Sequence, residues 1–88
     1  MKGPVTLGDA LSAIRESEEM SLSEFAAILE VSRSHLCDLE QGRRAVSPGR
    51  AARFAKALKQ HEAQFVRLAL QDQVHAAGLK LKVEVHAA

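Results

Sequence analysis

The sequence has few of the residues that stabilise small proteins by means other than helix packing. It contains one cysteine, no tryptophan, no tyrosine, two prolines and three phenylalanines among 88 residues. A single cysteine cannot form an internal disulfide, which favours a reducing compartment such as the cytoplasm. With so few aromatic side chains, the core is expected to consist mainly of leucine, valine, isoleucine and alanine. The abundance of alanine favours helices.

Signals for membrane insertion, catalysis and metal binding are also missing. We find no signal peptide and no apolar run of membrane-spanning length, so no membrane association is expected. The sequence has no glycine-rich phosphate loop and no paired catalytic carboxylates, which argues against an enzyme and against a cofactor. His35 and Cys37 lie two positions apart, on different sides of a helix, and His61, His75 and His86 lack the spacing of metal ligands. No metal site is predicted.

The charges are unevenly distributed along the chain, although the net charge is only +1. Residues 1–32 carry six acidic and two basic residues, whereas residues 33–60 carry seven basic and two acidic ones. Residues 61–88 are balanced. A basic block of this kind is either a solvated helix face or a surface that binds phosphate.

Five helices are predicted from the period of the apolar residues and from capping signals. Their expected ranges are 6–17, 22–29, 33–41, 48–59 and 62–77. Ser47 followed by Pro48 marks a helix start, and Gly42 and Gly78 mark helix ends. The predicted fold class is therefore all-α, with five helices within a domain of residues 1–78.

Residues 21–44 contain two capped helices separated by a short turn. Ser21 and Glu24 form an S-x-x-E capping box at the first helix. Ser32 is the second N-cap, and Val31 before it is placed to form a hydrophobic staple. Two such helices joined by about three residues make a helix-turn-helix, whose second helix enters the major groove of DNA.

The second helix of this pair has one apolar face and one polar face. Leu36 and Leu39 lie on the apolar face, which should be buried. The polar face carries Arg33, Ser34, Cys37, Asp38 and Gln41. An arginine can bind guanine and an aspartate can accept from cytosine N4. Asp38 is therefore either a base-reading residue or the ion-pair partner of a nearby arginine.

The segment from about Leu7 to Leu58 resembles the phage-repressor/Cro-type (XRE) helix-turn-helix family. The matching positions are Ser21, Ala26, Leu29, Val31, Ser32, Leu36, Leu39, Glu40, Gly42, Arg43 and Arg44. The resemblance implies a five-helix repressor-like bundle whose third helix reads double-stranded DNA. It also implies an internal ion pair between Arg15 and Glu40.

The resemblance assigns DNA contacts residue by residue. The base-reading positions are Arg33, Ser34 and Asp38, and the phosphate-contacting positions are Ser32, His35, Arg43 and Arg44. Arg50, in the basic block, is a further candidate for phosphate contact. The chain differs from the family at Leu22, where glutamine is usual, and at Glu30 in the turn, where glycine is usual.

The C-terminal residues 79–88 change period. Leu79, Leu81, Val83 and Val85 alternate with charged residues, which predicts a short β-strand. No other segment predicts a strand, so its hydrogen-bonding partner should be another molecule. The helix before it also carries more apolar surface than one small core needs. We therefore expect the dimer or partner surface to include Phe65, Leu70, Val74, Leu79, Leu81, Val83 and Val85.

Three functional hypotheses follow from these observations. The first is a homodimeric transcription repressor that reads a palindromic operator through its third helix. The second is an antitoxin that binds a cognate toxin and represses its own operon, since the size and the C-terminal strand also resemble antitoxins with this fold. The third is a protein-interaction module that has kept the bundle without DNA binding.

Overall fold

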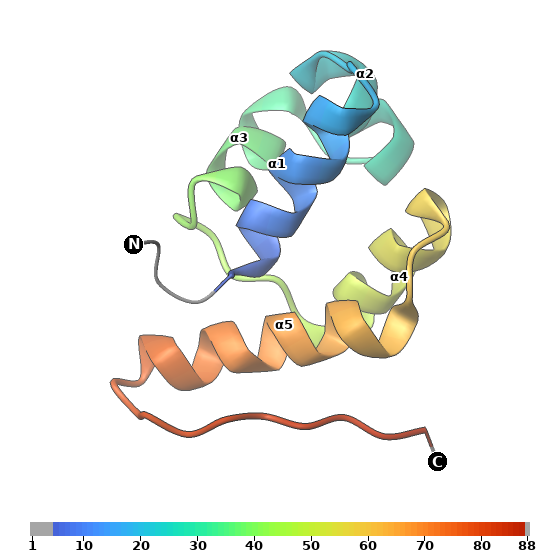
Figure 1. The fold of residues 1–88 in the computed structure, drawn as a ribbon. Coiled ribbons are helices and arrows are strands. Elements are labelled where there is room, and N and C mark those ends of the chain that lie inside the picture. Colours follow the sequence, from blue (N-terminus) through green and yellow to red (C-terminus); the bar gives the residue numbers. More distant parts are fainter. Residues whose placement is uncertain (1–4, 88) are drawn as a thin grey trace. The chain divides into compact units, whose positions relative to one another are not determined.

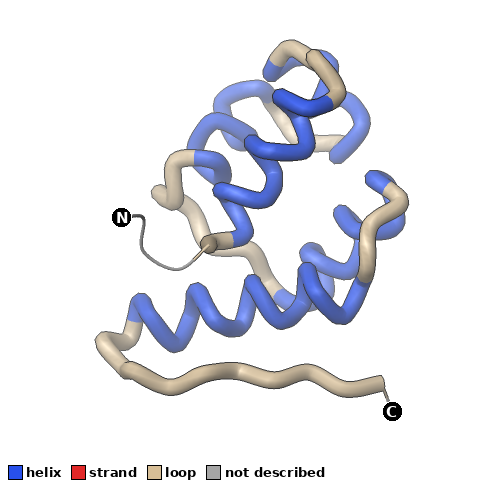
Figure 2. The backbone as a smooth tube through the Cα atoms, in the orientation of Figure 1, coloured by secondary structure: helices blue, strands red, loops and turns tan. Residues whose placement is uncertain are grey.

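The computed structural model describes residues 5–87, and this part of the chain contains five α-helices and no strand (Figures 1 and 2). The helices are α1 (Leu7–Ser17), α2 (Leu22–Leu29), α3 (Arg33–Glu40), α4 (Pro48–Leu58) and α5 (Glu62–Ala76). The predicted helices are confirmed, with each boundary within one residue of its expected position. The chain divides into two units, Met1–Arg44 and Ala45–Ala88.

Four of the five helices begin with a side chain that caps the backbone. The side-chain oxygens of Thr6, Ser21, Ser32 and Ser47 each accept a hydrogen bond from the backbone N–H three residues later, at 3.0–3.2 Å. Each bond satisfies a donor that the helix itself leaves unpaired. The N-cap of α5 is His61, which makes no capping bond with its side chain.

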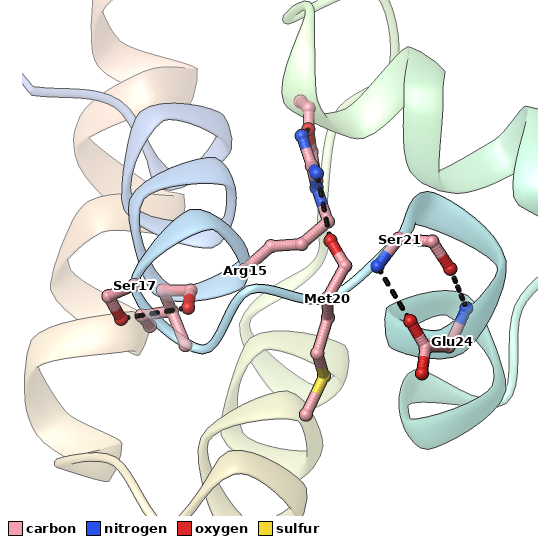
Figure 3. A network of polar contacts seen from close by, with 7 residues as sticks. Arg15, Ser17, Met20, Ser21 and Glu24 are labelled. Atoms are coloured by element: carbon pink, nitrogen blue, oxygen red, sulfur yellow. Dashed lines mark hydrogen bonds and ion pairs between the residues drawn. The ribbon is translucent and has the colours of Figure 1, made fainter.

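The cap of α2 is reciprocal. The Ser21 hydroxyl accepts from the Glu24 backbone N–H at 3.1 Å, and the Ser21 backbone N–H donates to Glu24 Oε1 at 2.9 Å (Figure 3). The Ser21 backbone and side chain both bond to this carboxylate and lower the pKa of Glu24. The predicted capping box is therefore present. It fixes the first residue of α2 by local contacts alone.

All five helices end in the same way, on a residue with left-handed backbone. The residue after it donates its N–H to the carbonyl five residues back, at 2.8–3.1 Å, which is the Schellman pattern. The left-handed residues are Glu19, Glu30, Gly42, Lys59 and Gly78. Only two of them are glycines, so three helix ends hold a side chain in a conformation that costs about 1 kcal/mol or more.

The unit that contains α1, α2 and α3 has a closely packed interior, with α1 and α2 both packed on α3. Its largest fully buried side chains are Leu7, Leu11, Phe25 and Leu36. Gly8 lies where α1 meets the end of α3. A Cβ built at Gly8 would clash with the carbonyl oxygen of the buried Leu39 and lie 3.0 Å from the next carbonyl oxygen. Only glycine fits this contact.

The second unit consists of α4 packed on α5, followed by residues 79–87, which we call the C-terminal segment. Phe54, Phe65 and Leu68 are buried, as are the small residues Ala51, Ala55 and Ala69. Phe65 is only 3% exposed, so its side chain belongs to the core and is removed from the predicted partner surface. Leu70 and Val74 stay half-exposed on α5.

The prediction of a β-strand at the C-terminal end is wrong. Residues 79–87 run back along α5 and form no β-ladder with any other described residue (Figure 1). The buried Gln71 of α5 provides the contact instead. Its Nε2 donates to the Leu81 carbonyl at 2.7 Å, and its Oε1 accepts from the Val83 N–H at 2.8 Å. A side-chain amide thus binds the backbone as a neighbouring strand would, because it offers the same donor and acceptor.

None of the helices within residues 5–87 is long and apolar enough to cross a lipid bilayer.

Candidate nucleic-acid interface

The turn between α2 and α3 spans residues 30–32. Glu30 adopts the left-handed conformation with φ 59° and ψ 41°. The Val31 N–H then bonds to the Ala26 carbonyl at 3.0 Å, which closes α2. The Ser32 hydroxyl accepts from the His35 N–H at 3.0 Å, which opens α3. The turn therefore forms with glutamate at the position where the repressor family usually has glycine.

Helix α3 has the two faces that its sequence predicts. Leu36 and Leu39 are 0% and 2% exposed and anchor the helix to its unit. On the other side, Arg33 and Ser34 are exposed and Asp38 is half-exposed. The three predicted base-reading residues are consequently together on the accessible side of one helix.

Asp38 forms an ion pair with the arginine that follows its helix. Arg43 Nε donates to Asp38 Oδ1 at 3.0 Å, and Arg43 Nη2 lies 3.7 Å from the Cys37 sulfur. The hydrogen bond to Asp38 raises the pKa of Arg43 above its ordinary value. The side chains remain 37% and 59% exposed, so water competes for this pair. Of the two interpretations of Asp38, the structure contains the ion pair.

The predicted phosphate-contacting residues lie on both units. Ser32 and Arg44 are exposed and flank α3, whereas His35 is half-exposed and lies within α3. The Ser32 oxygen accepts a hydrogen bond within its cap, but its hydroxyl hydrogen can still donate to a phosphate. Arg50 lies on the first turn of α4, in the second unit.

An ion pair between two helices fixes α3 within its unit. Arg15 of α1 contacts Glu40 through two parallel bonds, from Nε to Oε2 at 2.8 Å and from Nη2 to Oε1 at 3.0 Å. Arg15 Nη1 also donates to the Met20 carbonyl at 3.2 Å (Figure 3). The Glu40 hydrogen bond is the main cause that raises the pKa of Arg15. The pair holds the carboxyl end of α3 against α1, and the position of the polar face depends on it.

The first residue of α2 is Leu22, whose side chain is half-exposed and cannot form hydrogen bonds. Leu22 therefore cannot form a hydrogen bond to DNA of the kind that glutamine would offer at this position. Among residues 5–87, no group of three or more histidine, cysteine, aspartate or glutamate side chains is arranged to hold a metal ion.

Comparison with known proteins identifies the family. A model of the family described as "Helix-turn-helix domain" matches residues 6–68. The chain belongs to the helix-turn-helix domain family. The matched segment of this helix-turn-helix protein runs from the N-cap of α1 into α5 and excludes the C-terminal residues that Gln71 binds. The family assignment that residues 7–58 predict by resemblance is thereby confirmed.

Two solved structures resemble this helix-turn-helix protein. The crystal structure of the clp gene regulator ClgR from C. glutamicum has 32% sequence identity and a TM-score of 0.62, and the match covers 78% of this chain and 94% of that one. An HTH_3 family transcriptional regulator from Vibrio cholerae has 22% identity and a TM-score of 0.60, with 81% of this chain and 39% of that one covered. The second similarity concerns the fold alone. No match is found among curated proteins.

Proposed function

We propose that this helix-turn-helix protein is a sequence-specific regulator of transcription that inserts α3 into the major groove of double-stranded DNA. The observation that carries the proposal is the accessible polar face of α3, which is anchored from behind by the buried Leu36 and Leu39. An α-helix fits the major groove, and short polar side chains on its outer face can reach base edges.

The chemistry of the exposed residues supports direct base reading. Arg33, at the start of α3, can donate two hydrogen bonds to guanine O6 and N7. Ser34 can donate or accept and is therefore permissive. Asp38 can accept from cytosine N4 once Arg43 leaves it for a phosphate. Ser32, His35, Arg44 and Arg50 then contribute contacts that position the protein without reading sequence.

We further propose that the regulator acts as a homodimer on a palindromic operator and represses transcription. Half-exposed Leu70 and Val74 leave apolar surface on α5, which supports association. Two-fold symmetry would place two copies of α3 about 34 Å apart, one helical turn of DNA.

Selection of bound sites from a random double-stranded DNA library tests the proposal. Enrichment of a two-fold symmetric site supports it, and failure to enrich any sequence contradicts DNA reading and favours an interaction module. Arg33→Ala should then reduce affinity by about 1–3 kcal/mol at one base pair per half-site. Equal losses on all sequences would make Arg33 a phosphate contact.

The salt dependence of binding separates phosphate contacts from base contacts. Arg43→Ala and Arg44→Ala should each weaken binding to every sequence and reduce the slope of log affinity against log salt by about one. Lys56→Ala is the matched control, because it removes one exposed positive charge from α4 at a position that we do not propose to contact DNA. An equal change of slope in the control would mean that net charge alone is measured.

An antitoxin is the second candidate function. The observation that favours it is the C-terminal segment, whose backbone could join the sheet of another protein by strand addition. Co-purification with the product of an adjacent small gene, lost on deletion of residues 79–88 while DNA binding is kept, would support this candidate.

A further inference from the structure

The C-terminal segment has two backbone edges, and Gln71 occupies one of them. In an extended chain the N–H and C=O of one residue point to the same side, and successive residues alternate. Gln71 binds the Leu81 carbonyl and the Val83 N–H. The odd-numbered residues of the segment therefore direct their backbone N–H and C=O groups toward α5. The backbone groups of Lys80, Lys82 and Glu84 point the other way and make no hydrogen bond within residues 5–87.

We infer that this second edge pairs with the same edge of a second copy, as two antiparallel strands related by a two-fold axis at Val83. The inference rests on the two-copy assembly proposed above and specifies how the copies meet. It does not depend on DNA binding. A two-fold axis gives both copies the same contacts, so the segment must be complementary to itself.

Only one of the closest registers keeps like charges from lying opposite each other. With the axis at Val83, Lys82 lies opposite Glu84 of the second copy, and the same pair forms again across the axis. Leu81 then lies opposite Val85, which places apolar side chains together. With the axis at Lys82 instead, Lys80 would lie opposite Glu84, but the two copies of Lys82 would face each other on the axis, which destabilises a strand pair.

The same register uses the edge that is open. Lys82 and Glu84 are both even-numbered, so their backbone groups point across the axis and can exchange two hydrogen bonds. Parallel pairing in register would put Lys82 opposite Lys82 and Glu84 opposite Glu84. The exposed fractions of Leu79 and Leu81, 49% and 62%, show that apolar surface is present beside this edge.

Disulfide trapping in the full-length chain tests the register. In a Cys37→Ser background, Val83→Cys places two sulfurs across the axis, where the Cα atoms of a non-hydrogen-bonded pair lie about 4.5 Å apart. This separation is within the range that a disulfide bridges. Leu81→Cys is the matched control, because its two copies would lie about 13 Å apart along the strands.

We expect mild oxidation to convert most of the Val83→Cys protein into a covalent dimer and to leave the Leu81→Cys protein mainly monomeric. Equal cross-linking of both variants would overturn the register. If the unmodified protein sediments as a dimer and neither variant cross-links, strand pairing is wrong while the proposed dimer stands. If the unmodified protein sediments as a monomer at micromolar concentration, both are wrong, and strand addition to another protein gains support.

Charge reversal provides an independent measurement on the same pair. Lys82→Glu and Glu84→Lys should each weaken dimerisation about tenfold, because each places like charges opposite each other twice. The double variant Lys82→Glu/Glu84→Lys should restore the affinity of the unmodified protein. Failure of the double variant to recover would contradict a Lys82–Glu84 pair between copies.

Discussion

In each unit of this helix-turn-helix protein, a polar side chain with little exposure to solvent holds two segments together, and the two side chains do so by different interactions. The Glu40 side chain, 5% exposed, joins α3 to α1 through an ion pair with Arg15. Gln71, 6% exposed, joins α5 to the C-terminal segment through neutral hydrogen bonds to backbone atoms. The first contact is between two helices of the folded unit, and the second is between a helix and a segment at its surface.

The consequence of losing each contact follows from what remains behind. Removal of one partner of a buried ion pair leaves an uncompensated charge, which is strongly unfavourable. Removal of the Gln71 amide leaves a carbonyl and an N–H that water can reach once the segment moves away. The unit that carries α3 should therefore lose global stability, whereas the second unit should open locally.

The largest effect is expected at Glu40. Glu40→Ala should lower the free energy of unfolding by about 2–3 kcal/mol, at the lower end for a buried pair because Arg15 is still 19% exposed. Denaturant unfolding followed by circular dichroism measures it. In the double variant Arg15→Met/Glu40→Leu, no charge remains unpaired, so most of the loss should be recovered. A double variant as unstable as Glu40→Ala would contradict this explanation.

A glycine in each unit gives the next comparison. Gly8→Ala should lower the free energy of unfolding by about 1–3 kcal/mol, because its methyl group would enter the contact between α1 and α3. Gly49→Ala on α4 is the control, since a Cβ there meets nothing within 4 Å. That variant should instead gain about 0.5–1 kcal/mol from helix propensity. Equal effects of the two substitutions on the thermal midpoint would refute the close approach at Gly8.

Loss of the Gln71 amide should be local. Gln71→Ala should cost about 1 kcal/mol or less in global unfolding. It should also release the Val83 amide, whose hydrogen exchange would approach that of an unstructured chain. Gln73→Ala, at an exposed position of the same helix, is the control and should leave the exchange unchanged. If Val83 stays protected in the Gln71 variant, another contact holds the segment.

The smallest effect is expected at two helix ends that share one geometry. Glu30 ends α2 in the first unit and Lys59 ends α4 in the second, both with left-handed backbone at φ 59° and 56°. Glu30→Gly and Lys59→Gly should each stabilise the protein by about 0.5 kcal/mol. This net gain is the backbone strain that glycine relieves minus the conformational entropy that it adds to the unfolded chain. A rise in thermal midpoint in only one variant would mean that the other side chain makes a stabilising contact.

The helix boundaries could be predicted from the sequence because their signals are local. Ser21, Ser32 and Ser47 each cap the helix that directly follows them, and Gly42 and Gly78 supply the left-handed residues that end α3 and α5. Each signal acts over at most five residues, so no knowledge of the fold is needed to interpret it. The helix-turn-helix and its family followed from the spacing of these signals.

The contacts between distant residues were not predictable in the same way. Arg15 and Glu40 are 25 positions apart, and only the family resemblance paired them. Nothing in the local pattern shows that Gly8 meets the end of α3. The alternation of apolar and charged residues at positions 79–85 predicted a strand. Such a pattern shows which face of a segment is apolar, but it does not show which groups form hydrogen bonds with the backbone.

Gln71 did leave one signal in the sequence. It is a polar residue on the side of α5 that Leu68 and Val74 also occupy, and an amide on an apolar helix face usually has a hydrogen-bonding partner. The pairing of Asp38 with Arg43 was one of two interpretations that the sequence left open.

The Schellman ends and N-caps also bear on how quickly the chain folds. Because every helix from α1 to α4 is started and stopped by residues within its own neighbourhood, these helices need no distant contact to choose their limits. Proteins dominated by such short-range contacts fold on the microsecond to millisecond scale. Helices α1 and α3 pack together although they are not consecutive in the chain, so the rate of folding should depend on their docking more than on helix formation.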